Sequence, residues 1–200
     1  MNTNRNDCHS KSRDDPVRRK LLEEGRKSLY GQKARISVGM ATCGQIAGAQ
    51  EIYNTLAARN TWEGAIQVVK VGCRGACYAE PLVDVRLSDG THYFYGKMSK
   101  KALWHVIRTA EGKPAEDHVW AIARERHPGS FEGKFDLEFV KVFHSGFYDF
   151  FKRQTKRVTA RCGLIHPYCL AEYVAADGYR ALEKALFTLK PEEIIRMISD

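Results

Sequence analysis

Apolar positions along residues 33–112 recur at the spacings of alternating strands and helices. Runs that are rich in β-branched residues or alternate every second position predict strands at residues 33–39, 65–71, 82–87 and 92–95. Apolar residues three to four positions apart predict a helix over residues 44–59. A second helix is predicted from Ser99, a good N-cap residue, to Ala110, and Gly112 ends it.

The order of these elements indicates the fold class. A strand and a helix are followed by three strands and a second helix, and residues 88–90 (Ser-Asp-Gly) predict a hairpin turn between the last two strands. This order is typical of a thioredoxin-like α/β sandwich, in which helices flank a mixed sheet. We therefore predict an α/β domain over residues 33–112.

The chain before and after this domain has weaker patterns. Residues 1–32 form a basic leader that we predict to be largely disordered, although residues 16–30 have the apolar spacing of a short helix. Residues 113–146 contain two prolines and three glycines and predict an irregular connector. Within that connector, residues 137–143 are a candidate strand.

Residues 147–200 predict a small helical segment. An aromatic face runs from Phe147 to Val158, and a second helix is expected to begin at His166 and Pro167. Pro191 is expected in the first turn of a last helix, where its missing N–H does no harm.

Composition and charge exclude several classes of protein. With 44% hydrophobic and 28% charged residues in a chain of 200, a wholly disordered protein is excluded. The chain shows neither a run of apolar residues long enough to span a membrane nor a secretory signal, so we expect a cytoplasmic protein with reduced thiols. The net charge is +8, of which residues 1–35 carry +5 (ten Lys and Arg, five Asp and Glu). A solvated leader explains this better than nucleic-acid binding.

Three cysteines fall in loops that follow neighbouring strands. Cys43 follows the first predicted strand, and two more lie in residues 72–77, directly after the second. Thiolates are ligands of Fe–S clusters and of zinc, and glycines in such a loop expose N–H groups to inorganic sulfide. An arginine there would place positive charge beside an anionic cluster. The predicted metal ligands are Cys43, Cys73 and Cys77, and the predicted cofactor-binding residues are Gly72, Arg74 and Gly75.

Other roles remain open for these thiols. A thioredoxin-type dithiol needs Cys-x-x-Cys, whereas three residues separate Cys73 from Cys77. Structural zinc prefers shorter spacings and a closed set of four ligands. Unligated cysteines also pack as small apolar side chains.

The remaining cysteines and the histidines show no convincing motif. Cys162 and Cys169 flank His166 and could imitate a metal site, but two half-buried thiols at a helix boundary explain them better. Cys8 lies in the leader and is incidental. The histidines are expected at the surface rather than in a catalytic role; they are His92, His105, His118, His127 and His144. Paired carboxylates, a phosphate-binding loop and a nucleophile elbow are absent from the sequence, so no catalytic residue is predicted.

Three motifs in residues 38–83 match a known family. They read Val-Gly-Met-Ala-Thr-Cys-Gly at 38–44, Gly-Cys-Arg-Gly-Ala-Cys at 72–77 and Glu-Pro-Leu-Val at 80–83. With them, residues 38–112 resemble the thioredoxin-like [2Fe-2S] ferredoxin domain at the N-terminus of NADH-binding flavoprotein subunits. Such subunits occur in NAD-dependent hydrogenases and formate dehydrogenases and are related to the NADH-binding subunit of respiratory complex I.

The C-terminal part resembles the lead-in to the flavin domain of the same subunits. The matching blocks are residues 150–154, 161–165, 172–175 and 178–182. The resemblance implies that FMN and NADH bind in a continuation or a partner, because the family's glycine-rich flavin- and NADH-binding parts are not in these 200 residues. We therefore expect no catalysis by the chain alone.

One departure from the family affects the implied cluster. The family has a further cysteine five positions before the one that matches Cys43, and here that position is Val38, which cannot ligate iron. Two functions follow. The chain is either an electron-transfer module with a [2Fe-2S] cluster on three cysteines and one unidentified ligand, or a cluster-free module that docks a flavoprotein subunit onto its partners. The implied partners are a flavin-bearing domain or subunit and other iron–sulfur subunits, with no nucleic acid and no membrane span.

Overall fold

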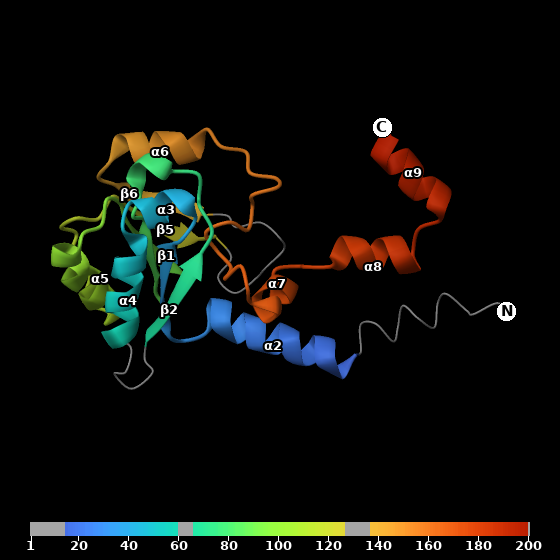
Figure 1. The fold of residues 1–200 in the computed structure, drawn as a ribbon, viewed down its shortest axis with the longest axis horizontal. Coiled ribbons are helices and arrows are strands. Elements are labelled where there is room, and N and C mark those ends of the chain that lie inside the picture. The colour runs from blue at the N-terminus through green and yellow to red at the C-terminus, as the bar shows by residue number, and fades with distance from the viewer. Residues whose placement is uncertain (1–14, 60–65, 127–136, 200) are drawn as a thin grey trace.

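A mixed sheet forms the body of the protein. The computed structural model describes residues 15–59, 66–126 and 137–199. Within them, six strands lie in the order β2-β1-β3-β4-β5-β6 (Figure 1). β1 and β2 are parallel, and every other neighbouring pair is antiparallel. The strands are β1 (Ala34–Gly39), β2 (Ile66–Val71), β3 (Val83–Arg86), β4 (Thr91–Tyr95), β5 (Ala121–Glu125) and β6 (Leu137–Val142).

Helices cover both faces of this sheet, which confirms the predicted α/β class with a mixed sheet flanked by helices. The α-helices of the described residues are α2 (Pro16–Tyr30), α3 (Thr42–Ile46), α4 (Ala49–Arg59), α5 (Leu103–Ala110), α6 (Ser145–Lys152), α7 (Leu170–Ala175), α8 (Arg180–Phe187) and α9 (Pro191–Ser199). There are also two short 3₁₀ helices, Cys77–Ala79 and Lys100–Ala102, in the described residues.

Side-chain alternation along the central strands gives the two faces different characters. Ile36 and Val38 of β1 pack with Val85 of β3 against α4 and α5, in the main apolar core. Residues that alternate with these along the strands, among them Arg35 and Asp84, point to the opposite face, where both are buried although they are charged. Part of that second face is apolar and packs against α6, through Phe94, Ala121, Ala123 and Phe147.

Most elements agree with the sequence pattern, and the differences have local causes. The helix predicted over residues 44–59 is two helices, α3 and α4, because Gly48 adopts a left-handed φ of 95° between them. α2 spans the predicted residues 16–30, and α9 begins at Pro191 as predicted. The aromatic face was predicted to reach Val158, which is wrong, since α6 ends at Lys152 and Val158 is fully exposed.

The predicted connector contributes to the sheet. The candidate strand at residues 137–143 is confirmed as β6. The sequence did not predict β5, which pairs with β4 on one side and β6 on the other. The second C-terminal helix begins at Leu170, a few residues later than His166.

α2 lies against α7, two segments that are far apart in the sequence (Figure 1). Their close approach depends on Gly25, where a Cβ would lie 2.0 Å from the carbonyl oxygen of Ala171. The disorder predicted for the start of the leader concerns residues 1–14, which lie outside the described residues.

α8 and α9 extend away from the sheet (Figure 1). Each has large apolar side chains in contact with solvent, including Leu186 and Ile198. Among the described helices, none combines the length and the apolar character needed to cross a membrane.

Candidate cysteine site

The predicted metal ligands lie at one edge of the sheet. β1 and β2 run parallel, with Gly39 paired to Val71, so the loops that follow them leave the sheet at the same end. The backbone N–H of Met40 donates to the carbonyl of Val71 (2.9 Å), which joins the starts of the two loops. The first loop leads into α3 and carries Cys43. The second, residues 72–77, is called the cysteine loop below.

Two sulfurs of the cysteine loop lie close together. The Sγ atoms of Cys73 and Cys77 are 3.9 Å apart, and the N–H of Gly75 donates to the Sγ of Cys73 (3.1 Å). Gly75 has a φ of 94°, a conformation that favours glycine, and this turn brings the N–H toward the sulfur. Two thiolates bonded to one tetrahedral metal at ~2.3 Å would be about 3.8 Å apart. The pair therefore has the spacing that a shared metal requires.

The surroundings of Cys73 favour the protonated thiol when no metal is bound. Burial raises the pKa of Cys73 above its ordinary value, the Gly75 N–H opposes that rise, and the nearby Cys77 adds to it. A metal ion would reverse this preference, because its charge displaces the thiol protons. The pair thus couples metal binding to proton release.

Cys43 lies in the first turn of α3 with its side chain exposed. Val38 is fully buried in the main core and offers no donor atom. Across residues 15–59, 66–126 and 137–199, no three side chains of the His, Cys, Asp or Glu types are arranged to hold a metal ion. The structure therefore brings together two of the three predicted ligands, and the role of Cys43 stays a prediction.

Arg74 directs its side chain to the sheet, and its role beside a cluster stays a prediction. Its side chain is buried, and Nη2 donates to Oδ2 of Asp84 (2.6 Å) on β3. The guanidinium also lies over the ring of Phe94. A sequence motif gives no side-chain direction, and here the carboxylate on the neighbouring strand decides it. Arg74 anchors the cysteine loop to the sheet.

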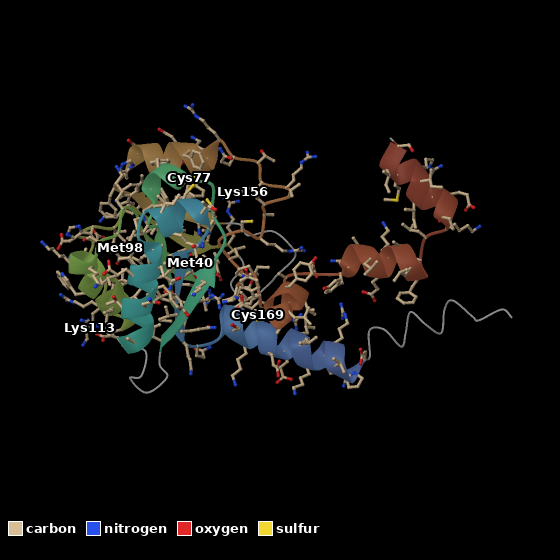
Figure 2. The ribbon with its side chains drawn as sticks, viewed as in Figure 1. Met40, Cys77, Met98, Lys113, Lys156 and Cys169 are labelled. Atoms are coloured by element: carbon tan, nitrogen blue, oxygen red, sulfur yellow. The ribbon has the colours of Figure 1, made fainter. Side chains whose placement is uncertain are left out.

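A second charged group, Lys156, supplies positive charge close to the sulfurs. Its Nζ donates to the backbone carbonyl of Arg74, inside the cysteine loop. Burial lowers the pKa of Lys156, the Arg74 charge lowers it further, and the Cys73 and Cys162 thiols oppose both effects. Figure 2 shows Lys156 and Cys77 at the same end of the molecule, with Cys169 in a different region. The sequence did not predict this lysine at the site.

Residues 146–165, called the covering segment below, lie over the cysteine loop. The Tyr78 hydroxyl donates to the carbonyl of Gly146 (3.2 Å), and the Tyr78 and Phe150 rings contact edge to face. A Cβ at Gly75 would lie 3.7 Å from the Phe150 ring. Phe150 therefore packs against one side of the loop, whereas Gly75 and Cys77 are exposed to solvent.

Glu80 is buried beside the first of the two loops. Its carboxylate accepts the Leu82 N–H (2.7 Å), and burial raises its pKa. Cβ atoms at Gly39 and Gly44 would approach this carboxylate to 2.8 and 3.2 Å. The glycines at 39 and 44 thus leave the space that the carboxylate occupies.

A network of buried charges lies on the second face of the sheet, and we call it the charged face. Asp84 accepts from Arg74 and contacts Nδ1 of His92 (2.9 Å), whose Nε2 is 3.2 Å from Glu125. Arg86 Nε donates to the same glutamate (2.8 Å). The charged face consists of Arg35, Arg74, Asp84, Arg86, His92, Glu125 and Glu172.

The charges on this face shift one another's titration. Burial acts to raise the pKa of Asp84, but His92 and Arg74 outweigh it and hold the pKa below its ordinary value. Burial acts to lower the pKa of His92, but Asp84 outweighs it and the pKa is raised. The expectation that the histidines lie at the surface is therefore wrong for His92, and also for His105, which is buried in α5. His127 lies outside the described residues.

The chain matches no protein-family model, and no curated protein is similar to it in sequence. Two solved structures of thioredoxin-like [2Fe-2S] ferredoxin from Aquifex aeolicus are similar to part of it. The wild-type structure is 17% identical with a TM-score of 0.37, and the match covers 44% of this chain and 96% of the ferredoxin. The second structure is 18% identical with a TM-score of 0.38, and the match covers 50% of this chain and 99% of the ferredoxin. At these values the likeness supports no inference about ligand or activity. Any such inference rests on this chain's own residues.

Proposed function

We propose that the chain is an electron-transfer module whose cysteine loop takes part in holding a [2Fe-2S] cluster. The observation that carries the proposal is the Cys73–Cys77 pair, with sulfurs 3.9 Å apart and one backbone N–H donated to a sulfur. Fe–S clusters are held by thiolates and tuned by such hydrogen bonds. Cys43, on the adjacent loop, is the third proposed ligand.

The cluster, when bound, would supply one-electron redox chemistry, and the protein would set its potential and its access to solvent. The Gly75 N–H withdraws electron density from the Cys73 sulfur, and Lys156 places a positive charge beside the loop. Both features favour the reduced, more negative form of a bound group. Cys77 is exposed, so this side of the loop is open to solvent.

The proposed partner is a flavin-bearing domain or subunit of an NADH-linked oxidoreductase complex that contains further iron–sulfur subunits. This part of the proposal rests on the resemblance of the motifs at 38–44, 72–77 and 80–83 to flavoprotein subunits. FMN and NADH are proposed to bind in that partner or continuation. The exposed apolar side chains of α8 and α9 suit helices that meet another surface.

A cluster-free assembly module is the second candidate, and two observations favour it. Val38 is buried in the core where the family has a ligand, and in the described ranges no group of three donors is arranged around one point. In that case the thiols have no redox role, and Cys73→Ser would leave the activity of the assembled complex unchanged.

The experiment that separates the two functions is a redox titration under argon. The full chain is reconstituted with iron and sulfide, then reduced stepwise with dithionite while the visible spectrum and the electron paramagnetic resonance signal are recorded. Electron transfer predicts a visible charge-transfer band that bleaches and returns on reoxidation, together with a signal from the reduced cluster. Cys73→Ala is expected to abolish both, and Cys169→Ala, the matched control, is expected to keep both. A native chain with neither band nor signal would support the assembly module.

A further inference from the structure

A fourth cysteine lies beside the cysteine loop, although it is far from that loop in the sequence. Cys162 belongs to the covering segment and is half-buried, with no disulfide. A Cβ built on Gly72 would lie 3.7 Å from the Cβ and 3.8 Å from the Sγ of Cys162. Gly72 directly precedes Cys73, so this thiol lies against the start of the loop that carries the sulfur pair.

The ammonium group of Lys156 links the covering segment to the cysteine loop. Lys156 donates to the carbonyl of Arg74, the residue after Cys73, and belongs to the same covering segment as Cys162. One cation therefore joins the cysteine loop to the segment that carries Cys162. A shared cation is suited to a site that gains negative charge when its thiols lose protons.

Two further contacts hold the residues around Cys162 in place. Gly163 has a φ of 83° and lies so close to the Arg74 side chain that a Cβ would be 2.1 Å from its Cγ. The carbonyl of Leu164 accepts from Nη2 of Arg35 (3.2 Å), on β1. The position of Cys162 is therefore determined by contacts of the two residues that follow it in the chain.

We propose that Cys162 supplies the fourth thiolate of the cluster site, in place of the donor that Val38 cannot offer. This inference rests on the proposed function. Cys169, the other cysteine in this part of the chain, caps α7, which packs on α2. It lies in a different region from Cys77 (Figure 2). Cys169 is therefore the matched control.

Each iron of a [2Fe-2S] cluster takes two protein ligands, so the site needs two pairs of sulfurs, of which Cys73 and Cys77 would form one and Cys43 and Cys162 the other. The absence of a side chain at Gly72 leaves space on the side from which Cys162 approaches. Each of the four thiols loses one proton to the solvent as its sulfur–iron bond forms, and no electron is exchanged. Four thiolates on a cluster core of charge +2 give a net charge of −2, which Lys156 partly offsets.

The test compares reconstituted native chain with Cys162→Ala, Cys169→Ala and Cys73→Ala. Iron and acid-labile sulfide per chain are measured, together with the rate at which an iron chelator removes the metal. Loss of a ligand is expected to speed iron release from Cys162→Ala by at least about tenfold, since even residues behind the ligands alter metal affinity by about 10–100-fold. Cys169→Ala is expected to release iron at the native rate.

A second measurement on the unmodified sequence guards against a variant that fails to fold. The native chain is alkylated with iodoacetamide before and after the chelator removes the metal, and each cysteine is followed by mass spectrometry. The proposal predicts that loading protects Cys162 together with Cys73 and Cys77, while the labelling of Cys169 does not change. If Cys162 is labelled equally in both states, or Cys162→Ala releases iron at the native rate while Cys73→Ala holds none, the fourth-ligand proposal is overturned and the proposed function stands. A native chain that takes up no iron overturns both.

Discussion

The cysteine loop together with Cys43, called the cysteine edge below, meets the charged face at Arg74, but the two regions differ in how their polar groups are partnered. On the charged face, ion pairs such as Arg35–Glu172 are buried and closed by several hydrogen bonds. At the cysteine edge, the sulfur pair receives a single backbone N–H, and Cys43 is exposed. Buried charges that are held by several partners keep a framework in one arrangement, whereas thiols with few partners are free to accept a ligand. The difference fits the function proposed above, in which the charged face is structural and the cysteine edge binds the cofactor.

The largest expected effect is on the charged face, from the loss of Glu172. This carboxylate accepts from Arg35, from Ser28 (2.6 Å) and from the His166 N–H (2.6 Å). Glu172→Ala would leave the Arg35 charge buried without its partner, and is expected to lower the free energy of unfolding by about 3–5 kcal/mol. Urea unfolding followed by circular dichroism measures this loss.

The control for Glu172 is an exposed ion pair. Asp177→Ala removes the partner of Arg180, whose side chain is 74% exposed, and is expected to change stability by less than about 1 kcal/mol. Equal losses in the two variants would show that the buried pair has no special structural role.

A smaller, pH-dependent effect is expected from His92. Its pKa is raised in the folded protein, so its charge stabilises the fold fully below the ordinary histidine pKa of about 6.5, and this contribution is lost as pH rises through the raised value. The stability gap between native protein and His92→Gln should therefore be largest near pH 6 and narrow toward pH 9. If folding raises the proton affinity of a histidine tenfold, the gap at low pH is about 1.4 kcal/mol.

Urea midpoints at several pH values test this, with His144→Gln as the control because His144 is outside the charged face. Asp84 has the opposite dependence, since its lowered pKa stabilises the fold above the ordinary aspartate value and that contribution is lost in acid. Measurements from pH 6 to 9 keep Asp84 ionised and leave His92 as the group that titrates on this face. A gap that widens with pH would contradict the account.

The smallest effect is expected at the cysteine edge. Cys43 is exposed, so in protein without metal Cys43→Ser is expected to change the free energy of unfolding by no more than about 0.5 kcal/mol. The same urea measurement applies, with the chelator present throughout. A loss comparable to that of Glu172→Ala would mean that this edge is structural, and the contrast between the two regions would fail.

The sequence predicted the main strands and the position of the thiols because both depend on local pattern. Alternation predicted β1 and β3, and the loops after β1 and β2 had to leave the same edge once the strands were parallel. β5 was missed because its five residues lie in a segment rich in prolines and glycines. The positions of the predicted strands and of the thiols thus follow from neighbours in the sequence or in the sheet.

The charged face and the fourth cysteine could not be predicted in this way. Polar residues such as Arg35 and Asp84 alternate with apolar ones along their strands, a pattern that normally indicates a solvent-facing side. Arg35 is buried because distant residues, Leu164 and Glu172 of α7, cover it, and Asp84 is covered by Arg74 of the cysteine loop. The contact between Cys162 and Gly72 likewise joins residues far apart in the chain, and no local spacing reports it.

The central claim is that the cysteine edge holds a [2Fe-2S] cluster, and metal content tests it most directly. The full chain is produced and purified under argon without added iron, and iron and acid-labile sulfide are measured per chain. The account predicts about two of each, and the same preparation of the Cys73→Ala, Cys77→Ala double variant should contain neither. Native protein that carries no iron or sulfide, and takes up none on reconstitution, would contradict it.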